Sequence, residues 1–142
     1  IKMPTSVTIA LDIMSGDNGP QPALSGAIKS LELIDDLKII LVGDEKLIKD
    51  NSISHNNRID ILHTDEFIRM DEDIIHAIRN KKKSSMRLAV NCVNDAHAQA
   101  CVSAGNTGAL MSISKIILKT INGIDRPAIC TSLPTKKNFM QV

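Results

Sequence analysis

Aromatic residues are almost absent from this sequence. Its 142 residues include no tryptophan and no tyrosine, and Phe67 and Phe139 are the only phenylalanines. Proteins that bind single-stranded nucleic acid stack its bases on aromatic side chains, so the composition excludes this class. A net charge of +1 gives no broad attraction for nucleic acid either. The core must therefore be aliphatic, with some methionine, which suits parallel strands covered by helices.

Cysteines, metal-binding motifs and long apolar runs are also scarce. Cys92, Cys101 and Cys130 are odd in number and widely spaced, so we expect buried thiols in a reducing cytoplasm and no metal site. No apolar run approaches the roughly 20 residues of a membrane span. The first residues lack the apolar core of a signal peptide. These absences predict a cytoplasmic protein.

The apolar periodicity predicts a single α/β domain with a mostly parallel sheet and helices on both faces. In such sheets, ligands bind at the carboxyl ends of the strands, here after Asp12, Ser103 and Ser132. The predicted strands are Val7–Leu11, Lys38–Val42, Ile59–Leu62, Ala100–Ser103 and Ala128–Ser132. The predicted helices run from Pro20 or Gln21 to Ile34, from Asp44 to Lys49, from Asp71 to Asn80, from Ser84 or Ser85 past Val93, and from the turn after Ser103 to Lys119 or Thr120.

The most informative segment is CVSAGNTGALM at positions 101–111. It is typical of a buried strand that runs into a small-residue turn and then a helix. Gly105 and Gly108 permit close backbone approach, and Asn106 or Thr107 can cap the helix. Such a turn directs free N–H groups and the positive end of a helix to one place, which favours an anion. A tight strand–helix connection is the alternative.

Two further segments carry polar groups. Asp12 and Asp17 flank a turn after the first strand and can accept a proton or position a substrate, although Asp is also common in turns. Two aspartates are too few to predict a magnesium site. The second segment is basic and runs from Arg79 through Lys81–Lys83 to Ser84 and Ser85. It can bind phosphate or an acidic partner, or form a solvated connection.

Together these segments resemble the bacterial fatty acyl-ACP:phosphate acyltransferases of phospholipid synthesis. The matching pieces follow the family's order and spacing, and the run SAGNTGALM is highly specific. Ser15 stands where the family usually has a second glycine. Family members also continue well past Val142, so we expect an N-terminal fragment that is inactive alone. The pieces are LDxMxGD at 11–17, LVG at 41–43, AxR at 77–79, SSM at 84–86, ACVSAGNTGALM at 100–111, GIDRPA at 123–128 and LP at 133–134.

The resemblance implies a three-layer α/β/α sandwich similar to isocitrate and isopropylmalate dehydrogenases, of which residues 1–142 form the N-terminal part. It implies a homodimer without an organic cofactor that transfers a long acyl group from acyl carrier protein to inorganic phosphate. Phosphate is itself the nucleophile, so the enzyme must position it and stabilise an oxyanion. A peripheral position at the inner face of the membrane is compatible with such a protein.

The resemblance and the residue chemistry together assign roles. A non-catalytic phosphate- or nucleotide-binding module is the alternative, and an inactive, swapped half-protein is a third. We expect the Asn106 side chain to face the cleft, so that Asn106→Ala still folds. The predicted catalytic residues are Asn106, Asp12 and Asp17; the predicted substrate-binding residues are Ser103, Gly105, Thr107, Gly108, Arg79, Ser84 and Ser85, with Lys82 as a further phosphate ligand; and Lys81, Lys82 and Lys83 are predicted to meet acyl carrier protein.

Overall fold

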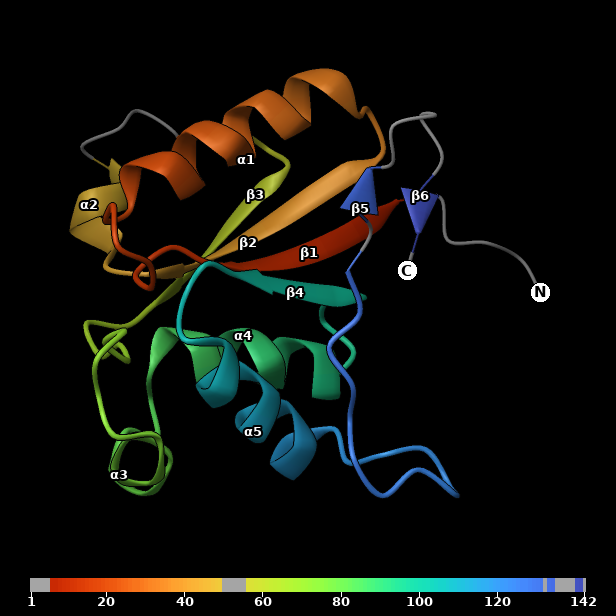
Figure 1. The fold of residues 1–142 in the computed structure, drawn as a ribbon. Helices are drawn as coiled ribbons and strands as arrows, with labels where there is room; N and C mark the ends of the chain where they lie inside the picture. Colours follow the sequence, from red (N-terminus) through yellow and green to blue (C-terminus); the bar gives the residue numbers. More distant parts are fainter. Residues whose placement is uncertain (1–5, 50–55, 132, 135–139, 142) are drawn as a thin grey trace.

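The computed structural model describes residues 6–49, 56–131, 133–134 and 140–141. A parallel four-stranded sheet with the order β3-β2-β1-β4 forms its centre (Figure 1). The register pairs Asp12 at the end of β1 with Ser103 at the end of β4, so the loops after these strands begin side by side. The strands are β1 (Val7–Asp12), β2 (Leu37–Gly43), β3 (Ile59–His63) and β4 (Ala100–Ser103).

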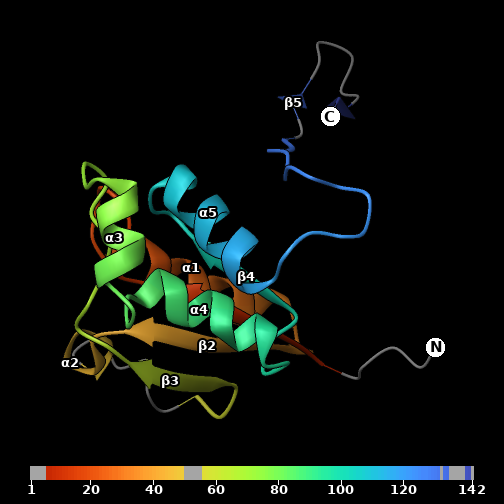
Figure 2. The ribbon, with the colours of Figure 1, turned by 90° about the horizontal axis from the view of Figure 1, so that it is seen from below.

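Helices cover both faces of the sheet, which confirms the α/β prediction. In Figures 1 and 2, α1 lies on one face, while α4 and α5 lie together on the other. The helices are α1 (Gln21–Leu33), α2 (Glu45–Lys49), α3 (Ile74–Asn80), α4 (Ser85–Asn94) and α5 (Thr107–Ile117). The sequence therefore predicted each helix, with α3 starting and α5 ending a few residues inside the predicted bounds.

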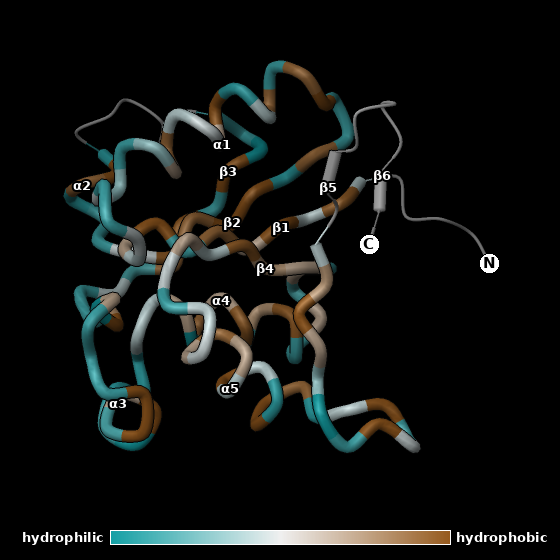
Figure 3. The backbone as a smooth tube through the Cα atoms, in the orientation of Figure 1, coloured by the Kyte–Doolittle hydropathy of each residue, from teal (hydrophilic) through white to brown (hydrophobic). Residues whose placement is uncertain are grey.

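The core lies in layers on the two sides of the sheet. Leu24 and Leu31 of α1 pack against Leu41 of β2 on one face. On the other face, Ala89 of α4 packs against Ala10 of β1. Figure 3 shows apolar residues along much of β1 and β2. The near absence of aromatic residues is thus matched by a core of Ile, Leu, Val, Ala and Met side chains.

The predicted strand at Ala128–Ser132 is wrong over residues 128–131, which have no regular structure and are exposed; Ser132 lies outside the described residues. Strand-like composition forms a strand only beside a partner, because an isolated segment cannot pair its N–H and C=O groups. A short antiparallel pair, β5 (Leu133–Pro134) with β6 (Met140–Gln141), follows along the chain. The LP piece at 133–134 therefore forms β5 of that pair.

Candidate active site: a groove that ends between two loops

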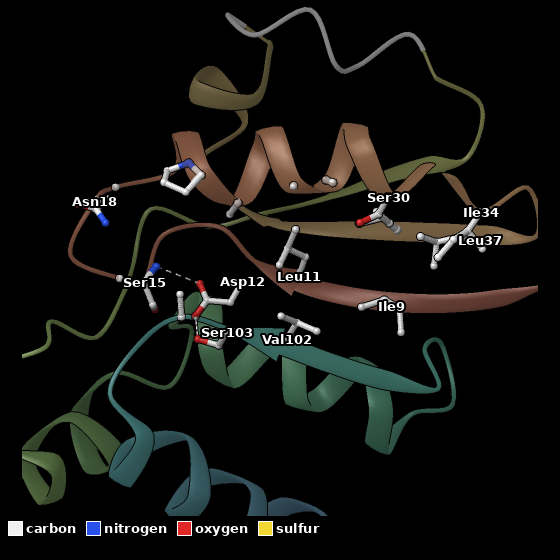
Figure 4. Close-up of a pocket in the computed structure, with 18 of the residues that line it drawn as sticks. Ile9, Leu11, Asp12, Ser15, Asn18, Ser30, Ile34, Leu37, Val102 and Ser103 are labelled. Atoms are coloured by element: carbon white, nitrogen blue, oxygen red, sulfur yellow. Dashed lines mark hydrogen bonds between the residues drawn. The ribbon is translucent and has the colours of Figure 1, made fainter. Parts of the chain in front are cut away.

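Asp12 joins the loops that follow β1 and β4. Its side chain is fully buried. One carboxylate oxygen accepts hydrogen bonds from the N–H groups of Met14 at 3.1 Å and Ser15 at 3.3 Å. The other accepts one from the Ser103 hydroxyl at 2.7 Å (Figure 4). A buried carboxylate is tolerated only with such donors, so Asp12 holds both loops in place.

The turn after β4 packs closely on the loop after β1. The Ser103 hydroxyl accepts a hydrogen bond from the Gly105 N–H at 3.2 Å. A Cβ on Gly105 would lie 2.6 Å from the Ser15 Cβ and 2.7 Å from the Met86 Cε, so this position requires glycine. Ser15 itself is not among the described non-glycine residues with positive φ, and serine at this position is therefore not strained.

A groove of about 760 Å³ runs between α1 and the adjoining face of β1 and β4. Its volume is typical of a small-molecule site. Figure 4 shows Ile9, Leu11 and Val102 along the strands, and Asp12 and Ser103 together at one end. The apolar walls also include Val7, Pro22, Ala23, Gly26, Ala27, Ile34, Leu37 and Ile39, and the polar end includes Ser15, Gly16, Asp17, Asn18, Gly19 and Ala104.

Asn106 is engaged within the fold, in contrast to the expectation that its side chain faces the cleft. Its side-chain oxygen accepts a hydrogen bond from the Ala109 N–H at 3.0 Å and caps α5. Its side-chain nitrogen donates to the Met70 carbonyl at 3.0 Å. Both polar groups of the Asn106 amide are therefore occupied within the fold.

The rest of the turn leaves its donors accessible. Thr107 is exposed, and neither its N–H nor that of Gly108 has an acceptor within the described ranges. A Cβ on Gly108 would lie 2.8 Å from the Ile74 Cδ1, so glycine lets α3 approach the start of α5. The first N–H groups of a helix have no partner in the helix, and here they lie just after the Ser103–Gly105 turn.

The two predicted serines at the start of α4 differ. Both are fully buried. The Ser84 hydroxyl donates to the Lys81 carbonyl at 3.1 Å, whereas the Ser85 hydroxyl has no partner in the part of the chain that the structure describes. Of this pair, only Ser85 has an unused hydroxyl.

The basic segment is divided between the fold and the solvent. The Lys81 ammonium donates to the Phe67 carbonyl at 2.7 Å and to Glu72 at 2.5 Å. Lys82 and Lys83 have exposed side chains, as does Arg79 in the last turn of α3. Among the described residues, the Lys82 ammonium reaches only the Ile78 carbonyl, at 3.2 Å. Lys81 therefore supports the fold, and the other three cations face solvent.

Two of the three thiols, Cys92 and Cys101, lie in surroundings that favour the protonated form. Burial raises the pKa of the Cys101 thiol, and the nearby Asp12 carboxylate raises it further. Burial also raises the pKa of Cys92. The expectation of three buried thiols holds for Cys92 but is wrong for Cys130, which is exposed. A protonated thiol is a poor nucleophile, so this environment does not favour Cys92 or Cys101 in that role.

Metal-binding clusters and membrane-spanning helices are both absent from the described residues. No group of three or more His, Cys, Asp or Glu side chains there could hold a metal ion. Within the same residues, no helix is long and apolar enough to cross a membrane.

Sequence reasoning missed the groove and Ser15. The signal for the groove is a row of small residues on α1 at helical spacing, namely Ala23, Gly26, Ala27 and Ser30, all of which line it. Only Ala23 and Ala27 of this row belong to the apolar periodicity that predicts the helix. Asp17 does line the polar end, although its side chain is exposed.

Comparison with known proteins places this geometry in a family. Residues 7–142 match the model of the family described as fatty acid synthesis protein. The chain belongs to this family. Similar proteins include the phosphate acyltransferase of Hydrogenovibrio crunogenus, 48% identical over 140 residues, and that of Shewanella halifaxensis, 51% identical over 138 residues. These alignments cover 96% and 94% of this chain.

This family member spans about two-fifths of the length of the curated relatives it matches. The alignments cover 42% of the Hydrogenovibrio crunogenus protein and 40% of the Shewanella halifaxensis protein. The phosphate acyltransferase of Shewanella baltica is 50% identical over 134 residues, with 92% of this chain and 39% of that protein covered. The loops joined by Asp12 both lie inside the family match.

Proposed function

We propose that the complete protein transfers a fatty acyl group from acyl carrier protein to inorganic phosphate, as a step in phospholipid synthesis. The observation that carries this proposal is an apolar groove whose polar end is lined by residues of the loops after β1 and β4, in a chain about 50% identical to phosphate acyltransferases. The six residues of β1 span about 20 Å. This length accommodates an extended long acyl chain, with its carbonyl at the polar end near Ser103.

The reaction needs no covalent enzyme intermediate. A phosphate oxygen attacks the thioester carbonyl carbon, the carbon–sulfur bond breaks, and the proton of hydrogen phosphate ends on the carrier thiol. Acyl phosphate and free carrier protein leave. Holding the two reactants together supplies much of the rate by proximity. The N–H groups of Thr107 and Gly108 supply donors for the developing negative charge.

The other residues divide between positioning and binding. Asp12 is a positioning residue, because its oxygens fix the two loops, and Asp17 is the exposed carboxylate available to accept a proton. Ser85 is favoured over Ser84 as a phosphate ligand because its hydroxyl is unused. Arg79 is exposed in the last turn of α3, where its charge attracts phosphate. Lys82 and Lys83 form the exposed surface for acidic acyl carrier protein. A homodimer and attachment at the inner membrane face belong to the same proposal.

Release of the carrier thiol from acyl carrier protein, measured with and without phosphate, tests this function. We expect release by the complete protein only when phosphate is present, with one acyl phosphate formed for each thiol. Equal release without phosphate would indicate a thioesterase and contradict the proposal.

A further inference from the structure

The Ser15 hydroxyl is a buried polar group that the fold does not use. Ser15 is 3% exposed, and its Oγ has no hydrogen-bond partner among the described residues. Its backbone is nevertheless anchored, because its N–H donates to Asp12. A buried hydroxyl without a partner is unfavourable, since it has lost its hydrogen bonds to water. Such a hydroxyl favours a bound ligand as its hydrogen-bond partner.

Ser15 is one of the residues that line the polar end of the groove. Its side chain packs against the turn after β4, because a Cβ on Gly105 would lie 2.6 Å from the Ser15 Cβ and 3.2 Å from its Oγ. The same turn leads into the first N–H groups of α5, an 11-residue helix. The hydroxyl therefore lies beside a turn that presents backbone donors and the positive end of a helix.

We propose that Ser15 donates its hydroxyl to an oxygen of the phosphate that the reaction consumes. This inference rests on the proposed function and adds a ligand to the same site. Two nearby hydroxyls are occupied, since Ser103 donates to Asp12 and Ser84 to the Lys81 carbonyl. The Asp12 carboxylate lies close to Ser15 and would repel an anion. Its oxygens accept three hydrogen bonds, which offset this charge.

A neutral donor is suited to a nucleophilic anion. Direct pairing with Lys or Arg positions phosphate but withdraws charge from the attacking oxygen. A hydroxyl holds the anion with less loss of nucleophilicity. Ser15 therefore contributes to phosphate binding more than to the rate of the bound complex, and its loss raises the phosphate KM while kcat changes little.

Steady-state kinetics of the complete protein with Ser15→Ala test the inference, with phosphate varied at saturating acyl carrier protein substrate. We expect the phosphate KM to rise about 5- to 10-fold, the effect of one lost neutral hydrogen bond. Ser25→Ala is the matched control, because Ser25 is exposed on α1 and does not line the groove. Phosphate-induced stabilisation against heat gives a second readout that is independent of turnover.

The outcomes separate this inference from the proposed function. In the absence of phosphate, Ser15→Ala should melt at or above the wild-type temperature, because the removed hydroxyl has no partner in the fold. A lower melting temperature would reveal a structural partner and overturn the inference. An unchanged phosphate KM would also overturn the inference, because the partner of the hydroxyl would then be a buried water molecule. Wild-type turnover that does not depend on phosphate would instead contradict the proposed acyl transfer to phosphate.

Discussion

At the scale of the residue, some polar groups of the site form hydrogen bonds within the fold and others remain available to a ligand. Asp12 and Ser103 hold the loops together, whereas Ser15 and Ser85 have buried hydroxyls without partners in the described chain. Residue type could not predict this division. The sequence placed Asp12 and Ser103 in the site, but which oxygen bonds to which donor depends on the parallel pairing of β1 with β4.

Asn106 gives the first prediction at this scale. Asn106→Ala removes the cap of α5 and should lower the free energy of unfolding by about 1 kcal/mol, as measured by urea denaturation. Turnover should also fall, because the cap fixes the turn whose N–H groups are the proposed donors. Asn106→Asp keeps an acceptor for the Ala109 N–H and should retain most of the stability. Full stability of the alanine variant would show that the cap is not needed.

A second prediction concerns the ion pair between Lys81 and Glu72. The hydrogen bond from the Lys81 ammonium holds the pKa of Glu72 below its ordinary value of 4.5. A carboxyl with a lowered folded-state pKa contributes stability above the unfolded value, and this contribution is lost as the pH falls through the folded pKa. The pair should contribute less than about 1 kcal/mol, because both side chains remain partly exposed.

Urea denaturation of wild type and Lys81→Met at several pH values measures this contribution. We expect the variant to be less stable at pH 7 and the difference to shrink below pH 4.5. A difference that stays constant down to pH 2 would show that Lys81 acts through packing rather than charge.

At the scale of the element, helix α1 shapes the groove because small residues line the side of the helix that faces it. Local periodicity predicted α1 well, since Leu24, Ala27 and Leu31 form a buried stripe at helical spacing. Periodicity could not show that Gly26 and Ser30 face open space, because this depends on what lies beside the helix. The prediction of a strand at 128–131 failed for a similar reason, because a strand needs a neighbouring strand and composition does not show whether one is present.

Gly26 gives the prediction for this element. A Cβ at Gly26 meets no atom within 4 Å, and glycine inside a helix costs about 1 kcal/mol relative to alanine. Gly26→Leu should therefore fold well while its side chain enters the groove. If the acyl chain occupies the groove, the complete protein should shift its preference towards shorter acyl chains, as measured by kcat/KM over a series of acyl carrier protein substrates.

Two controls sharpen this test. Gly26→Ala adds only a methyl group and should leave the preference close to that of wild type. Ser25→Leu places the same large side chain on an exposed position of α1 that does not line the groove. An unchanged preference in a well-folded Gly26→Leu protein would mean that the groove receives something other than the acyl chain.

At the scale of the whole molecule, the basic surface and the groove should serve different substrates. Lys82 and Lys83 are exposed, while Lys81 is bound to Phe67 and Glu72. The double variant Lys82→Gln/Lys83→Gln should raise the KM for acyl carrier protein several-fold at low salt, because exposed charges are screened as ionic strength rises. The phosphate KM should not change. A changed phosphate KM with unchanged carrier affinity would assign these lysines to the anion site.

The proposed function places the acyl chain in the groove beneath α1, with its carbonyl at the Asp12–Ser103 end. Photocrosslinking tests this most directly, with an acyl carrier protein substrate whose terminal acyl carbon bears a diazirine. In the complete protein, we expect adducts at the end of the groove away from Asp12, on Val7, Ile34 or Leu37. Excess unlabelled substrate should abolish them. Adducts confined to other parts of the protein would contradict the account.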